Sequence, residues 1–269
     1  MTKINKETMM KKTKILLWCL ILLPINAWSL TPEEKGLAIA KEADKRDTGW
    51  VDQKAELVMV LKNRQGQESK RKIRISTLEV SGDGDKSMSI FDTPRDVKGT
   101  TFLSYTHALK ADDQWMYLPA LKRVKRISSK NKSGPFMGSE FAYEDISSQE
   151  VEKYTYKWLR DEKHDGHDTY VLELTPTYKN SGYTKQIVWG DKTMYQPWKI
   201  EFYDRKGELL KTLTYKGYNK YLDKFYRPTE MYMNNHITKK STTLTWNNYT
   251  YNNGLTARDF DRNSLKRAR

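Results

Sequence analysis

Apolar and polar residues alternate with a period of two along much of the chain after residue 50. In residues 55–62, Ala55, Leu57, Met59 and Leu61 fall on one face. Such alternation is typical of strands with one buried and one solvent-facing side. Turn sequences such as 63–66 and 165–166 separate these segments, which predicts about ten or eleven strands in an antiparallel meander within one domain. The same period recurs in residues 72–76, 87–90, 153–158, 169–174, 187–189, 200–202 and 225–233.

One helix is expected before the strands. Thr31 is a good N-cap, Pro32 takes the first helical position, and Glu34 at the third position completes a capping box. Gly49 lies just beyond the expected end of the helix. A thin apolar stripe is formed by Leu37, Ala40 and Ala43.

The first 29 residues predict a secretory signal peptide. Lysines 11, 12 and 14 precede the apolar run 15–23, and Ala27 and Ser29 supply small residues for cleavage after Ser29. The alternative is an uncleaved membrane anchor, but the run has only about ten residues where a spanning helix needs roughly 20. The mature chain, residues 30–269, is therefore expected in the periplasm.

The only cysteine, Cys19, lies inside the apolar run. Trp18 precedes it and apolar residues follow it, unlike a lipoprotein signal, so no lipid attachment and no disulfide are expected. Residues 30–269 carry 43 basic and 33 acidic residues, a net charge of +10. A basic surface suits anionic lipid head groups or an acidic partner. Nucleic acid is not expected as a partner of an exported protein.

The segment 128–149 breaks the alternation. It is rich in Ser and Gly and contains several aromatic residues. Long loops in compact domains are usually either functional or disordered, and the aromatic residues argue against disorder. We therefore predict a functional loop, or short helices, crossing the sheet.

Three stretches together resemble a known family: 45–50; then 91–99 with 102–103 and 115–123; and 136–145. In this order they resemble the outer-membrane lipoprotein-sorting, LolA-like periplasmic proteins, over nearly all of residues 30–269. The resemblance implies a half-open antiparallel β-barrel with short helices plugging its concave apolar face. It also implies a carrier of acyl chains or lipoproteins that contacts membranes transiently.

The same resemblance implies a partner. This branch of the family accompanies inner-membrane transporters of the resistance-nodulation-division superfamily. It implies no cofactor and no enzymatic activity, and we expect a monomer. The prediction depends on the strands curving around a hollow that can hold a hydrocarbon tail.

Candidate cargo-binding residues follow from the alternation and from the aromatic loop. Each could instead be an ordinary core residue. The predicted wall comprises Leu57, Met59, Met88, Ile90, Phe102, Trp115 and Tyr117. The predicted lid residues are Phe136, Met137, Phe141 and Tyr143.

A basic run at 122–126 is the candidate contact for a partner or a lipid head group. It could equally be a solvated strand face. Its charged members are Lys122, Arg123, Lys125 and Arg126.

Catalytic chemistry has few candidates. There is no Gly-x-Ser-x-Gly elbow, phosphate loop or His-Glu-x-x-His motif. The segment 164–168 holds two histidines and two aspartates that could bind zinc, yet Asp165-Gly166 is also a strong turn signal. Glu144 and Asp145 are expected to cap a short helix or to pair with a basic residue.

Three other functions remain open: an outer-membrane β-barrel protein, an envelope hydrolase using His164–Asp168, and a scaffold protein.

Overall fold

The computed structural model describes residues 30–267, and the predicted signal peptide with its cleavage site and Cys19 lies outside them. One helix, α1, spans Pro32–Arg46 and has the expected capping box on Thr31. The strands of the main sheet are β1 (Asp52–Lys62), β2 (Glu68–Leu78), β3 (Lys86–Thr93), β4 (Thr101–Tyr105), β5 (Asp113–Leu118), β6 (Arg123–Ile127), β7 (Tyr154–His164), β8 (His167–Pro176), β9 (Tyr183–Asp191), β10 (Pro197–Asp204), β11 (Leu209–Lys216), β14 (Glu230–Asn235) and β15 (Ser241–Tyr251).

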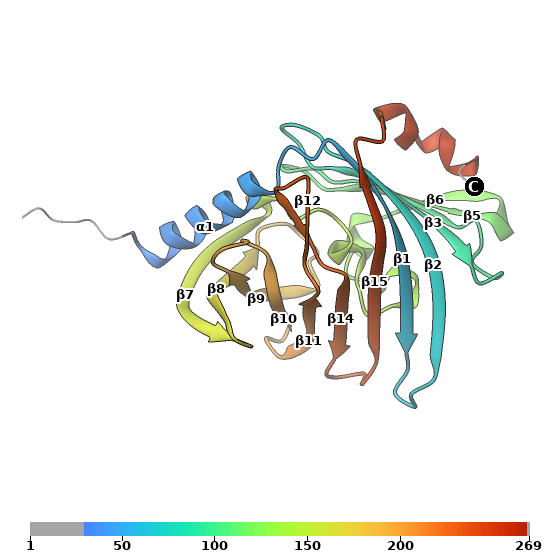
Figure 1. Ribbon diagram of the computed structural model, residues 1–269. Helices are drawn as coiled ribbons and strands as arrows, with labels where there is room; N and C mark the ends of the chain where they lie inside the picture. The colour runs from blue at the N-terminus through green and yellow to red at the C-terminus, as the bar shows by residue number, and fades with distance from the viewer. Residues whose placement is uncertain (1–29, 268–269) are drawn as a thin grey trace, which may run out of the picture.

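These 13 strands form one antiparallel sheet in the order β6-β5-β4-β3-β2-β1-β15-β14-β11-β10-β9-β8-β7. The sheet bends into a trough with α1 beside β7 (Figure 1). Because β6 and β7 are edges that do not pair with each other, the trough stays open. The mainly β, half-open architecture is therefore confirmed, and a closed outer-membrane barrel is not favoured.

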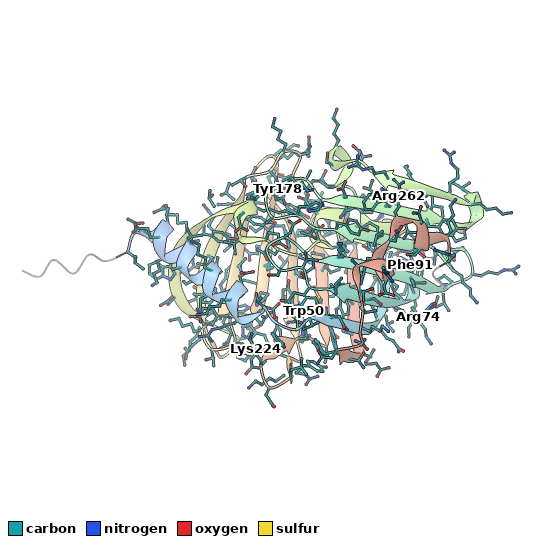
Figure 2. All side chains as sticks on the ribbon, turned by 90° about the horizontal axis from the view of Figure 1, so that it is seen from above. Trp50, Arg74, Phe91, Tyr178, Lys224 and Arg262 are labelled. Carbon is teal, nitrogen blue, oxygen red and sulfur yellow. The ribbon has the colours of Figure 1, made fainter. Side chains whose placement is uncertain are left out.

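The strand count is higher than predicted. Beside the main sheet, β12 (Asn219–Tyr221) and β13 (Phe225–Arg227) form a small hairpin. These strands are too short to show a period. The segment 225–233, predicted as one strand, is divided between β13 and β14 because Pro228 interrupts it. Trp50 and Lys224 lie near the end of α1, where the Lys224 ammonium donates to the carbonyl of Thr48 (Figure 2).

The chain order explains why one segment crosses the trough. Strands β6 and β7 follow each other in sequence but form opposite edges of the sheet. The connection, residues 128–153, must therefore span the sheet, and we call it the lid. It contains four short 3₁₀ helices: η2 (Ser129–Asn131), η3 (Phe136–Gly138), η4 (Tyr143–Asp145) and η5 (Val151–Lys153). This confirms the prediction of short helices or a loop crossing the sheet.

The C-terminal segment covers the other face of the sheet. After β15, the 3₁₀ helices η6 (Ala257–Phe260) and η7 (Arg262–Lys266) place Phe260 and Leu265 against Met88 and Leu103. Successive residues of a strand point to opposite faces. Accordingly Phe102 belongs to the cluster under the lid, whereas Leu103 belongs to the cluster under the C-terminal segment. Strands β3–β5 are thus covered on both sides.

Within residues 30–267, no helix is long and apolar enough to span a bilayer.

Candidate functional site

The lid inserts aromatic side chains into the apolar concave face of the sheet. Phe136 is 2% and Phe141 1% exposed, and both belong to the central cluster. The ring of Phe136 lies 5.1 Å from that of Phe102 on β4 and 5.5 Å from that of Tyr143. Edge-to-face pairs at such distances add stability beyond burial alone. The lid therefore fills the space that the curved strands enclose.

The backbone of the lid presents its two phenylalanines together. The Phe136 N–H donates to the carbonyl of Phe141 at 2.7 Å, which closes a tight loop. Within this loop Met137 and Gly138 both have positive φ, at 51° and 77°. The Ser139 hydroxyl donates to the Phe136 carbonyl at 2.7 Å. Because these hydrogen bonds hold the turn together, Phe136 and Phe141 point into the trough as one unit.

Polar groups on the wall fasten the centre of the lid. The buried Lys211 ammonium lies 2.7 Å from Asp145 and donates to the Glu140 carbonyl at 2.9 Å. The Tyr183 hydroxyl donates to Asp145 at 2.8 Å, and the Asn235 amide donates to the Glu140 carboxylate at 2.7 Å. Burial and the nearby Asp145 charge raise the pKa of Tyr183 well above its usual value, so its hydroxyl stays protonated. In these contacts the sheet supplies the donors and the lid supplies the acceptors, whereas the Glu140 N–H donates to the Thr242 hydroxyl at 3.0 Å.

Further contacts attach the lid to the rest of the molecule. Glu144 accepts hydrogen bonds from the Tyr178 hydroxyl at 3.0 Å and the Gly182 N–H at 2.8 Å, and burial raises its pKa. Near β7, burial and the neighbouring Asp85 carboxylate raise the pKa of Glu150 to about 7. Burial likewise raises the pKa of Asp85 to about 6. The lid is attached by many polar contacts as well as by its apolar side chains.

A pocket of about 200 Å³ lies beside the lid, between α1 and strands β8–β10. Its walls are mainly apolar, with Asp44 and Asp47 of α1 and its C-cap among the lining residues. Val188 and Ile200 line it and also pack against the central cluster, so the pocket adjoins the space filled by the lid. Ligand pockets for small molecules usually measure about 300–1,000 Å³. The pocket is therefore smaller than such sites while the lid is in place.

The hollow is smaller than the sequence predicted. The strands do curve around a common apolar space, but the lid occupies the centre of it. The sequence could not show how deeply the aromatic residues of 128–149 insert. Phe91 of β3, labelled in Figure 2, is fully buried in the same central cluster.

The structure divides the predicted cargo-binding residues between two faces. Leu57, Met59 and Phe102 lie on the concave face with the lid residues Phe136, Met137, Phe141 and Tyr143. Four other predicted wall residues lie on the opposite face, in the cluster under the C-terminal segment, so the structure does not bring them to the lid. They are Met88, Ile90, Trp115 and Tyr117.

Sequence reasoning missed the polar half of the site. Lys211 is in phase with Leu213 and Tyr215 on β11, so a lysine on an apolar face was the available signal. Asn235 and Tyr183 carried no such signal. The sequence also could not show that Glu140 and Asp145 of the lid contact Asn235 and Lys211 of the sheet. As expected, Asp145 both accepts the Ala142 N–H near the start of η4 and pairs with a lysine.

The segment 164–168 forms a turn. His164 and His167 are paired at the ends of β7 and β8, and Asp165 and Gly166 between them have positive φ. The His167 ring stacks on Trp198 at 3.9 Å. Among residues 30–267, no group of three or more potential ligands is arranged to hold a metal ion. The segment is an ordinary hairpin turn.

The basic run lies on the edge strand β6 and the preceding turn. Lys122 adopts a left-handed conformation between η1 (Pro119–Leu121) and β6. The other three side chains are also exposed, and Arg126 makes an ion pair with Asp113 at 2.5 Å. Both interpretations, a contact surface and a solvated strand face, fit these positions.

A family model described as "uncharacterized protein" matches residues 83–267. None of the curated proteins matches the chain.

The solved structures that are similar to this chain include the following three. A domain from Vibrio parahaemolyticus, provisionally named an outer membrane lipoprotein-sorting protein domain, is 60% identical with a TM-score of 0.86, covering 87% of this chain and 99% of that one. A DUF1329 family protein from Desulfovibrio piger is 32% identical with a TM-score of 0.83, covering 88% and 100%. A LolA superfamily protein, NE2245 from Nitrosomonas europaea, is 22% identical with a TM-score of 0.68, covering 87% and 99%. The last supports the fold alone. These matches confirm the resemblance seen in the sequence: the chain belongs to the DUF1329 family, and its open, lidded half-barrel is LolA-like.

Proposed function

We propose that this protein is a periplasmic carrier, with residues 30–269 as its lipid-binding domain, which binds acyl chains or a lipoprotein under the lid and passes them between the envelope membranes. The observation that carries the proposal is the insertion of Phe136 and Phe141 into the concave face beside a partly open apolar pocket. Acyl chains and these side chains require the same apolar surroundings, so each can replace the other. The lipoprotein-sorting name of the Vibrio parahaemolyticus domain supports the same role.

The energetics suit reversible binding. Burying a hydrocarbon chain contributes about 0.8 kcal/mol per methylene. Moving the lid breaks its aromatic contacts and the ion pair between Lys211 and Asp145, which offsets part of that gain. A carrier must release its cargo, and a lid that returns to the same surface favours release. The carrier role needs no chemical step, so we propose that the protein is not an enzyme.

The direct test is to identify what the exported protein carries. Protein purified from the periplasm without detergent, extracted and examined by mass spectrometry, is expected to contain acyl lipid at a substantial fraction of one molecule per chain. Protein unfolded and refolded in lipid-free buffer is the matched control. Protein that carries no lipid and also fails to take up an acyl probe would contradict the proposal and would favour a scaffold role.

We further propose an inner-membrane transporter of the resistance-nodulation-division superfamily as a partner, through the basic run on β6. Replacing Lys122 and Arg123 with glutamate reverses two exposed charges. Each basic residue near an anionic surface contributes about 1 kcal/mol. The double variant is therefore expected to bind vesicles rich in phosphatidylglycerol, or the acidic face of the transporter, at least tenfold more weakly at low salt.

The control for this surface is the double reversal of Lys70 and Lys72 on β2, which leaves β6 intact. Equal binding by the β6 variant and the unmodified protein at low salt would remove the basic run from the function. A loss of equal size in both variants would point to net charge and not to a specific surface.

A further inference from the structure

One basic side chain is buried in the wall of the trough. Among residues 30–267, Lys211 is the only lysine or arginine on a strand of the main sheet that is buried. It is 3% exposed and lies 5.2 Å from the centre of the Phe202 ring and 5.1 Å from that of Tyr183. A buried cation is costly unless it is paired. Lys211 therefore needs an anion next to it to stabilise its charge on this mainly apolar face.

That anion is supplied by the lid. Asp145 lies 2.7 Å from the Lys211 ammonium and also accepts from Tyr183. The Glu140 carboxylate accepts from Asn235 at 2.7 Å. The donors stand on three strands of the rigid sheet, β9, β11 and β14, whereas both carboxylates belong to the lid. These three donors on the sheet therefore form a preformed anion site.

Movement of the lid would empty this site. Asp145 and Glu140 would leave together, because they lie five positions apart on one short segment. Lys211, Asn235 and Tyr183 would remain on the sheet, facing the bound cargo without partners. A neutral tail cannot satisfy these donors, and unsatisfied buried polar groups are unfavourable. A cargo with its own negative oxygens can.

We propose that the cargo is an anionic amphiphile, whose carboxylate or phosphate replaces the lid carboxylates on Lys211, Asn235 and Tyr183. This inference rests on the proposed function, since it assumes that cargo displaces the lid. Lysine acts as a point charge toward such groups, and the amide and phenol add directional hydrogen bonds. The tail occupies the apolar space that Phe136 and Phe141 vacate.

The test compares two probes that differ only in charge: dansyl-labelled undecanoic acid and its methyl ester. Binding is followed by dansyl fluorescence on the unmodified mature protein. We expect the acid to bind at least tenfold more tightly than the ester. This comparison needs no variant, so it decides the question even if a substitution impairs folding.

Two substitutions on the same ion pair should act in opposite directions. Lys211→Met removes the cation and is expected to weaken acid binding at least tenfold, with little effect on the ester. Asp145→Asn removes the competing carboxylate and is expected to strengthen acid binding severalfold. A merely structural ion pair would give losses in both variants. Lys199→Met is the matched control, because Lys199 lies on β10 next to Ile200, facing Trp189 on the other side of the sheet.

The outcomes separate this inference from the proposed function. Equal binding of acid and ester would overturn the anionic assignment and leave the carrier role standing, whereas no binding of either probe would count against both. Tight, Lys211-dependent binding of inorganic phosphate or acetate alone would show a site for small free anions and would overturn the head-group assignment. We expect neither ion to displace the acid at millimolar concentration.

Discussion

Replacing Phe102 with alanine is expected to lower the free energy of unfolding by about 3–5 kcal/mol. Its side chain is fully buried on β4, with ring centroids 5.1 Å from Phe136 and 5.7 Å from Tyr143. The sheet on one side and the lid on the other restrict collapse around the vacated space. Small domains have only about 5–15 kcal/mol of stability, so the loss should be obvious in equilibrium urea unfolding of residues 30–269.

The matched control is Phe136→Ala, which removes the same ring contact from the lid side. If the lid opens separately from the sheet, this variant should lose less global stability. It should instead speed the hydrogen exchange of lid amides such as those at position 136 and at Tyr143, whose N–H groups are bonded within the lid. Equal global losses in both variants, with lid amides exchanging only on complete unfolding, would show that the lid has no separate motion.

The sequence predicted many of the strands that have one wet face, but not β11 or β15. In β1 the alternation of buried and less buried residues follows the alternation of residue types. It could not delimit β4, where Thr101–Ser104 are all buried. The lid covers one side of this strand and the C-terminal segment the other, and a strand buried on both faces loses its period. The failure to predict β4 therefore follows from two covering segments that are distant from it in sequence.

Alternation also shows which residues share a face without showing which face is concave. In β3, Ile90 and Phe91 are adjacent and both apolar, so either could have lined the hollow. The structure places Phe91 under the lid and Ile90 under the C-terminal segment. The predicted wall residues on β3 and β5 were assigned to the wrong side for this reason. The lid residues were found because four apolar side chains in a loop need a surface to cover them.

Locking the lid with a disulfide should abolish loading altogether. A β-carbon built on Gly182 would lie 3.0 Å from that of Ser133, where disulfides need about 3.8 Å. A few tenths of an ångström of adjustment on each side, with the Glu144 carboxylate moving aside, would therefore allow Ser133→Cys and Gly182→Cys to bond. Residues 30–269 contain no other cysteine. The bond would tie the start of the lid to the loop between β8 and β9.

The oxidised double variant is expected to bind the dansyl acid at least tenfold more weakly than the reduced one, and reducing agent should restore binding. Each single cysteine variant controls for the substitutions themselves, since neither can close the bond. Binding that is equal in the oxidised and reduced forms would mean that the pocket between α1 and β8–β10 accepts the chain without lid movement. Because that pocket measures about 200 Å³, below the usual size for a ligand site, we expect the locked lid to exclude the cargo.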